Sequence, residues 1–209
     1  MRATISAKAV RAIAPWASKD LSRRIITSIK IDILPGAYRL VATDSYRLAV
    51  IEGKRQGDGE ASLTIDGSAL ADQLKASDDY LVIDTETMTA YAGKREPSEP
   101  MDYLEQHKED HRAIIKLREV EGRFPDWKKL IPDEQQTTTT ETVSVNPRYL
   151  EDSGKLVKTI AGRQTTPLHI CLQSPTTPVL LWSNINHLQI LARMVVMPVR
   201  DDNAMPVYC

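Results

Sequence analysis

Apolar residues along the chain gather in short runs, rich in valine and isoleucine, that glycine, proline or charged residues interrupt. Such runs are typical of buried strands. The clearest stretch, residues 40–51, has two apolar runs around Thr43, Asp44, Ser45, Tyr46 and Arg47, and it predicts two strands joined by a polar turn. By the same criteria we expect strands at 25–34, 38–43, 48–52, 80–84, 87–92, 113–119, 168–172, 179–183 and 192–198.

One short pattern occurs three times, each time before a segment whose apolar residues have helical spacing. At 4–10, 64–70 and 144–150, a β-branched strand end is followed by Ser6, Asp66 or Asn146, which are residue types that favour the N-cap of a helix. The third copy adds Pro147 at the first helical position. One such match could arise by chance, but three matches with caps in register favour a repeat. We therefore predict an α+β protein of three units, each a strand, a helix and about three further strands.

The positions of the three units set the expected domain boundaries. Units at 1–55 and 61–132 follow each other closely, and the second contains a polar insertion at 96–112 that we expect to be exposed and mobile. Residues 133–141 include four consecutive threonines and predict a linker. The third unit covers 142–200, and residues 201–209 form a tail.

The composition is that of an ordinary globular protein. Of 209 residues, 42% are hydrophobic and 26% are charged, and no apolar run approaches the roughly 20 residues that cross a bilayer. The two cysteines, Cys171 and Cys209, lack metal-binding spacing and indicate a reducing compartment. With no secretory signal at the start of the sequence, we expect a cytoplasmic protein without membrane association.

Catalytic patterns are weak in this sequence. His107 and His111 are four residues apart, as zinc-binding histidines on a helix can be, but the intervening glutamate is misplaced for the metalloprotease motif and no third ligand is evident. A solvated polar loop explains the pair more simply. His169 and His187 are isolated, and Asp44 suits a turn. We therefore predict no enzyme activity and no cofactor, with a metal-dependent enzyme using the histidine pair as the remaining alternative.

Basic residues are concentrated near two of the expected helices, although the net charge of the whole chain is only −1. If the helices share one face, these side chains would form a strip for DNA phosphates, without regard to base sequence. Charge alone favours the simpler interpretation that they solvate exposed helix faces. The candidate DNA-facing residues are Lys8, Arg11, Lys75, Arg148, Lys155 and Lys158.

Three segments together resemble a known family, the bacterial sliding clamp, which is the β subunit of the replicative DNA polymerase. They are VATDSYRLAV at 41–50, GRFPDWKKLIP at 122–132 and VVMPVR at 195–200, in the order that the family has them. The resemblance implies the DNA-clamp fold, with antiparallel sheets and with helices on one face toward a central hole. It also implies that 1–132 is one complete clamp domain, the family's second, and that 142–200 is the last half of its third.

The resemblance also implies a cleft in which partner proteins insert a short peptide with apolar anchors. Ser45, Tyr46, Lys129 and Val199 depart from the family's usual residues, and the apolar members would also suit a plain strand core. The implied cleft residues are Arg23, Ile26, Thr43, Ser45, Tyr46, Arg47, Leu48, Pro125, Lys129, Leu130, Val195, Met197, Pro198, Val199 and Arg200.

Two functions follow from this resemblance as expectations. The first is a processivity factor that binds double-stranded DNA and tethers a replicative polymerase, a clamp loader or another protein with a clamp-binding peptide. A family ring has twelve units, so four copies of a three-unit chain could close one, and a homo-oligomer is expected. The alternative is a reduced clamp that encircles no DNA and acts as an adaptor or decoy for such peptides. Within the tail 201–209, the stretch Met205-Pro206-Val207-Tyr208 is apolar enough to fold into its own cleft or a neighbour's.

Overall fold

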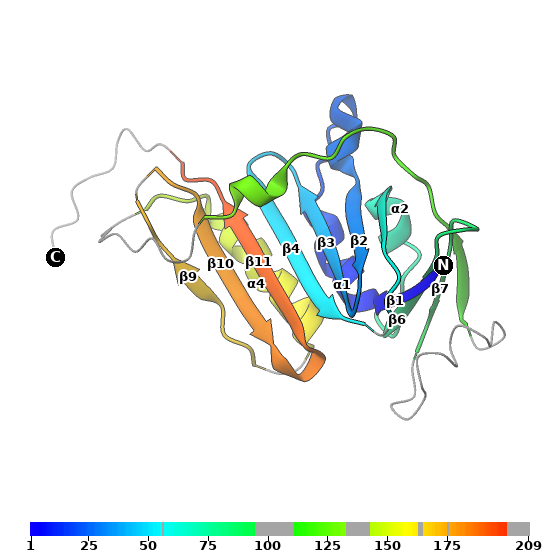
Figure 1. Cartoon of the computed structure of the whole chain (residues 1–209). Coiled ribbons are helices and arrows are strands. Elements are labelled where there is room, and N and C mark those ends of the chain that lie inside the picture. The colour runs from blue at the N-terminus through cyan, green and yellow to red at the C-terminus, as the bar shows by residue number, and fades with distance from the viewer. Residues whose placement is uncertain (56, 95–110, 133–142, 163–164, 175, 200–209) are drawn as a thin grey trace, which may run out of the picture.

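A computed structural model describes residues 1–55, 57–94, 111–132, 143–162, 165–174 and 176–199, and it is an α+β structure of two antiparallel sheets with helices (Figure 1). The smaller sheet has the strand order β1 (Arg2–Ser6), β6 (Tyr80–Asp84), β7 (Thr89–Gly93) and β8 (Ala113–Lys116). The larger sheet has seven strands, in the order β5 (Ala61–Ile65), β2 (Ile29–Leu34), β3 (Ala37–Thr43), β4 (Arg47–Lys54), β11 (Ile190–Val196), β10 (Val179–Ile185) and β9 (His169–Cys171).

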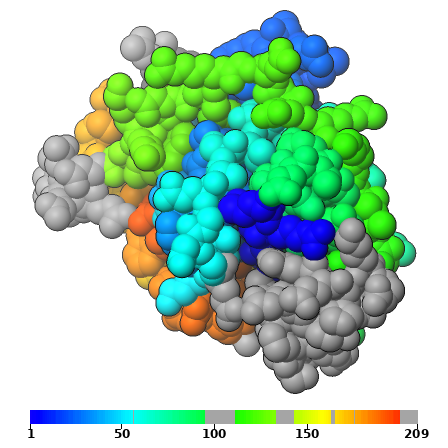
Figure 2. All heavy atoms as spheres, turned by 45° about the vertical axis from the view of Figure 1, so that its right-hand side comes forward, coloured from blue at the N-terminus to red at the C-terminus, as the bar shows by residue number. Residues whose placement is uncertain are grey.

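The first two units exchange their first strands. Strand β1 begins the first unit but pairs with β6 of the second, with Ile5 opposite Leu81. Strand β5 begins the second unit and pairs with β2 of the first, with Ile65 opposite Ile29. The exchange buries β1 between the units, and the dark blue N-terminal residues in Figure 2 accordingly lie between cyan residues of the first unit and green ones of the second.

The third unit extends the sheet of the first. Strands β4 and β11 pair along their whole length, with Leu48 opposite Val195 and Gly53 opposite Ile190. Since the hydrogen-bonded ladder continues across this junction, the seven strands form one surface although the two units are far apart in sequence.

Three α-helices cover one face of the seven-stranded sheet or its border with the smaller sheet: α1 (Ala7–Ile13), α2 (Gly67–Ala71) and α4 (Pro147–Ala161). The predicted caps are confirmed, because the side chains of Ser6, Asp66 and Asn146 accept hydrogen bonds from backbone N–H groups of the first helical turn. The main core lies between these helices and the sheets; its larger helix residues are Val10, Ile13, Leu70, Leu156, Val157 and Ile160. No helix among the described residues is long and apolar enough to cross a membrane.

Some predicted strands are shorter than expected. The strand predicted at 25–34 begins only at Ile29, since residues before it form a 3-10 helix, η2 (Leu21–Thr27), capped by the Asp20 side chain. Other 3-10 turns are η1 (Ala14–Trp16), η4 (Trp127–Leu130) and η5 (Asn186–Leu188). The strand expected before α4 is not formed by the described residues 143–146, and Lys75 lies beyond the end of α2.

Candidate functional site

The turn between β3 and β4 is held by its own side chains. The Thr43 hydroxyl donates to the Arg47 carbonyl (2.7 Å), and the Asp44 carboxylate accepts from the backbone N–H groups of Tyr46 (3.0 Å) and Arg47 (3.1 Å). Ser45 has a positive φ of 84°. These bonds fix the turn and present the Tyr46 side chain to solvent, with 65% of it exposed.

An apolar cluster lies beneath this turn, on the face of the sheet opposite the helices. Phe124 and Trp127, from the segment 122–132, pack on β3, β4, β10 and β11, and this segment (green) crosses the upper ends of β4 and β11 in Figure 1. The aromatic side chains thus tie the second unit to the sheet shared by the first and third. The buried cluster consists of Val41, Leu48, Val50, Phe124, Trp127, Leu180 and Val195.

The end of β11 passes directly beside the turn. The N–H of Met197 donates to the Tyr46 carbonyl (3.0 Å), and the N–H of Val199 donates to the Ser144 carbonyl (2.8 Å). Met197 is 42% and Val199 49% exposed, so two apolar side chains are open to solvent at the end of β11. We call Tyr46, Met197 and Val199 the Tyr46 patch.

Arg47 lies on the other face of the sheet from Leu48, because neighbouring strand residues point in opposite directions. Its side chain bonds to Asp44 (2.9 Å), Asp152 of α4 (2.5 Å) and the Pro15 carbonyl (3.1 Å), and only 9% of it is exposed. The guanidinium also stacks over the Trp16 ring at 4.7 Å. Arg47 is therefore a structural link between the first and third units, and it does not share a surface with the Tyr46 patch.

The other predicted cleft residues fall into three environments. Ile26, Thr43, Leu48 and Val195 are buried, and Pro198 is partly buried. Arg23, Ser45, Pro125, Lys129 and Leu130 are exposed, with Lys129 paired to Asp126 (3.1 Å). Arg200 lies outside the described residues. The sequence motifs thus come together around the start of β4 and the end of β11, although only part of the predicted set is accessible.

The predicted DNA-facing residues differ in exposure and in whether a carboxylate already neutralises their charge. Lys8 is paired with Asp79 (2.7 Å) and Lys155 with Glu151 (2.7 Å), and the hydrogen bond to Glu151 raises the pKa of Lys155. Arg148 has 75% of its side chain exposed and is 4.0 Å from Asp152, and Lys158 and Lys75 are exposed. Arg11 is partly buried. The available positive charge therefore lies mainly on α4.

The histidine pair gains no support as a metal site. His107 lies outside the described residues, and Nδ1 of His111 is 3.0 Å from the Tyr80 hydroxyl, against whose ring it packs edge-on. The described residues contain no group of three or more potential metal ligands. Arg112, at the end of the predicted insertion, is anchored to Asp78 by an ion pair; residues 96–110 lie outside the description.

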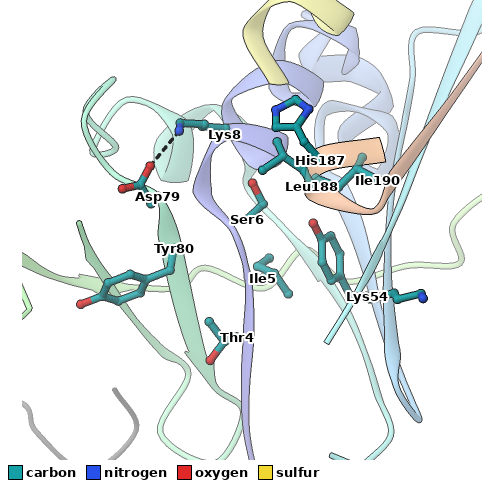
Figure 3. A pocket seen from close by; sticks show the side chains of 11 residues that line it. Thr4, Ile5, Ser6, Lys8, Lys54, Asp79, Tyr80, His187, Leu188 and Ile190 are labelled. Carbon is teal, nitrogen blue, oxygen red and sulfur yellow. Dashed lines mark hydrogen bonds and ion pairs between the residues drawn. The ribbon is translucent and has the colours of Figure 1, made fainter. Parts of the chain in front are cut away.

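Sequence reasoning missed a cavity of about 480 Å³ between β1, the start of α1 and the loop at η5 (Figure 3). Ser6, Lys8 and Asp79 lie on one side of it and His187 on another, and Tyr38, whose burial raises its pKa to about 12, closes the inner wall. No sequence signal could have found it, because its residues come from separate units. Of the charged side chains that line it, Lys8 and Asp79 form an ion pair at 2.7 Å, and Lys54 is the third.

The comparisons with known proteins agree with this architecture. No family model matches the chain. The β sliding clamp of Synechocystis is 28% identical over an alignment that covers 76% of this chain and 40% of that protein. The sliding clamp of Bacillus subtilis matches with a TM-score of 0.66 at 14% identity, over 96% of this chain and 64% of that one. The β subunit of Streptococcus pyogenes DNA polymerase matches with a TM-score of 0.67 at 16% identity, over 95% of this chain and 65% of that one.

A sliding clamp from Pseudomonas aeruginosa, solved with griselimycin bound, matches with a TM-score of 0.63 at 16% identity and over 96% of this chain and 66% of that one. The present chain spans about two fifths of the curated relative and just under two thirds of the solved clamps. The chain has the fold of the bacterial sliding clamps and resembles one of them in sequence, as its three motifs indicated.

Proposed function

We propose that the chain is a sliding-clamp-like processivity factor, an accessory protein that lies along double-stranded DNA and tethers a DNA polymerase or another replication protein. The observation that carries the proposal is the seven-stranded sheet that runs through two units and has α1 and α4 side by side on one face. A sheet of this kind can present helices to a DNA duplex on one face and leave the Tyr46 patch exposed to partners at its other side.

Contact with DNA in this proposal is electrostatic and independent of base sequence. Arg148 and Lys158 are exposed on α4, and phosphate contacts of such residues carry no base information. Lys8 and Lys155 would contribute less, since each already has a carboxylate partner. With a net charge of −1, the chain has no overall attraction to DNA, so the helix face must supply it.

The test is duplex binding at several salt concentrations, by fluorescence anisotropy of a labelled 40-base-pair DNA. The double variant Arg148→Glu, Lys158→Glu is expected to weaken binding by about tenfold or more and to reduce the salt slope. Lys128→Glu, Lys129→Glu is the matched control, because it reverses the same number of exposed charges on the segment that covers the opposite face. Equal losses in both, or no duplex binding by the unmodified chain, would contradict the proposal.

The second part of the proposal assigns partner binding to the Tyr46 patch. The patch offers three exposed apolar side chains beside a fixed turn, which suits a short peptide with apolar anchors. Of the residues that the family resemblance implies, Leu48 and Val195 would support the patch from below, while Leu130 and Lys129 lie exposed on the neighbouring turn η4.

An adaptor or decoy that encircles no DNA is the second candidate. It would need only the Tyr46 patch, whose three residues are 42–65% exposed, and none of the basic residues on α4. Light scattering over a concentration series separates the two candidates. A stable mass near four times 23.4 kDa fits a ring of twelve units, whereas a monomer that fails to bind duplex DNA but retains a ligand at the Tyr46 patch fits the adaptor.

A further inference from the structure

The three units can be aligned strand by strand from their pairing. Ala49, Ala113 and Ala192 occupy the same place on the last strand of each unit, and two residues later each unit has a buried apolar residue. These buried residues are Ile51, Ile115 and Met194. Two steps of strand pairing lead from them to Ile31, Ile83 and Ile170, which are therefore equivalent and lie on the helix-facing side of their strands.

The equivalent isoleucines differ sharply in exposure. Ile31 and Ile83 are fully buried, but Ile170 is 54% exposed, and Leu172, two residues further on the same face, is 37% exposed. The reason lies in the strand exchange: β2 is covered by β5 and β6 by β1, whereas β9 has no neighbour on its outer side among the described residues. The core of the third unit is therefore open where the other two are closed.

The third unit also carries an extended segment in the position that such an exchange needs. Residues 143–146 precede α4 as β5 precedes α2, and the two segments make the same bond on one edge. The N–H of Val199 donates to the Ser144 carbonyl (2.8 Å), just as the N–H of Val120 donates to the Thr64 carbonyl (2.8 Å). The other edge of β5 pairs with β2, while the other edge of 143–146 has no strand beside it in the described part of the chain.

We propose that the third units of two copies of this chain complete one another by exchanging residues 143–146. Each copy lays this segment along β9 of the other, which buries Ile170 and Leu172 and makes a full domain from two half domains. The interface is two-fold symmetric, because each third unit supplies both the open strand and the segment that covers it. By equivalence with Thr64 opposite Lys30, Ser144 of one copy lies opposite His169 of the other.

The inference rests on the proposed function only because a closed ring needs such a contact. The observations behind it, the open edge of β9 and the exposed Ile170, do not involve DNA. Two chains joined in this way supply six units in a row. A second contact, at the open edge of β8, would be needed to reach twelve. The exchange therefore predicts even-numbered assemblies.

Light scattering on the full chain tests the exchange first. Ile170→Lys is expected to halve the mass of the assembly, since the lysine charge would be buried in the interface. The side chain is exposed in a single chain, so the substitution leaves folding intact. Leu21→Lys on η2, where the leucine is 79% exposed, is the matched control away from both sheet edges and is expected to leave the mass unchanged. An unmodified chain that is monomeric throughout, or an Ile170→Lys variant of unchanged mass, would overturn the proposal.

Disulfide trapping tests the register. In a Cys171→Ser, Cys209→Ser background, Ser144→Cys with His169→Cys is expected to give a covalent dimer, because facing residues on paired strands are close enough for a disulfide. Ser144→Cys with Ile170→Cys places the thiols on opposite faces and is expected to stay monomeric on a non-reducing gel. Cross-linking of neither pair, or equally of both, would contradict the exchange. A trapped dimer that binds no duplex would contradict the proposed function alone, and duplex binding without trapping would contradict this interface alone.

Discussion

Arg47 and Asp152 are 105 residues apart in sequence, yet their side chains meet at 2.5 Å between the start of β4 and the helix α4. The pair joins the first unit to the third on the helix side of the sheet, directly behind the turn that carries Tyr46. Only 9% of the Arg47 side chain and 21% of the Asp152 side chain are exposed. The junction between the two units is thus held by a largely buried charge pair as well as by the β4–β11 ladder.

Arg47→Ala is expected to lower the free energy of unfolding by about 2–3 kcal/mol, because it leaves Asp44 and Asp152 without their cation and removes the contact with the Trp16 ring. Urea unfolding followed by circular dichroism measures this change. Arg148→Ala is the matched control: its side chain is 75% exposed and 4.0 Å from the same Asp152, so a loss of at most about 0.5 kcal/mol is expected. If both variants lost similar amounts of unfolding free energy, the buried Arg47–Asp152 pair would contribute no more to stability than the exposed one.

The stability of the chain should fall in acid through a small group of paired carboxylates. Partial burial raises the pKa of Glu52, but hydrogen bonds and charges of Arg39 and Arg193 outweigh this and hold the pKa below its ordinary value. Burial also raises the pKa of Asp78, but the hydrogen bond and charge of Arg112 outweigh this and hold the pKa below its ordinary value. Because these folded-state pKa values lie below those of the unfolded chain, the ion pairs stabilise the fold above about pH 4–5. That stability is lost as the pH falls through the lowered values.

Glu52→Gln should therefore flatten the acid limb of the stability profile, measured as the urea midpoint between pH 3 and pH 7. At pH 7 the variant is expected to be less stable by about 1 kcal/mol, since Glu52 is 29% exposed and links β3 and β11 through Arg39 and Arg193. The exposed Glu121→Gln serves as the control. An unchanged acid limb in Glu52→Gln would show that this carboxylate does not drive the pH dependence.

Local signals in the sequence predicted much of the fold but little of how the units connect. The caps at Ser6, Asp66 and Asn146 were predictable because a cap depends on residues within three positions of it. The exchange of β1 and β5 was not predictable, because the sequence of an apolar strand does not specify the unit with which it pairs. Arg47 was assigned to the cleft from the motif around it, whereas its partner Asp152 is contributed by a distant helix.

The cap of α4 can be tested separately from the rest of the unit. The Asn146 side chain accepts from the N–H of Arg148 (3.0 Å), and Pro147 follows at the first helical position. Asn146→Ala is expected to cost about 1 kcal/mol of stability, and Asn146→Asp to restore it, because both Asn and Asp can accept this bond. Thermal unfolding of the three proteins measures the difference; an Asp variant as unstable as the Ala variant would contradict the capping role.

Griselimycin, with which the Pseudomonas aeruginosa clamp was solved, can be titrated against this chain to test the partner binding proposed for the Tyr46 patch. If the patch is the ligand surface of this chain, Met197→Ala and Val199→Ala should each weaken binding by about fivefold to thirtyfold in calorimetry, which corresponds to roughly 1–2 kcal/mol of lost apolar contact. Both side chains are more than two fifths exposed, so their loss should leave the urea midpoint unchanged.

Tyr46→Ala decides between two roles of the bulky side chain at this turn. As an anchor, Tyr46 would contribute contact area, and its removal should weaken griselimycin binding. As an obstruction that narrows the surface, its removal should tighten binding instead. Ile114→Ala, an exposed apolar residue on β8, is the control for non-specific adsorption. Binding that changes equally in the control and in all three patch variants, or that none of the three alters, would place the ligand surface elsewhere on the molecule.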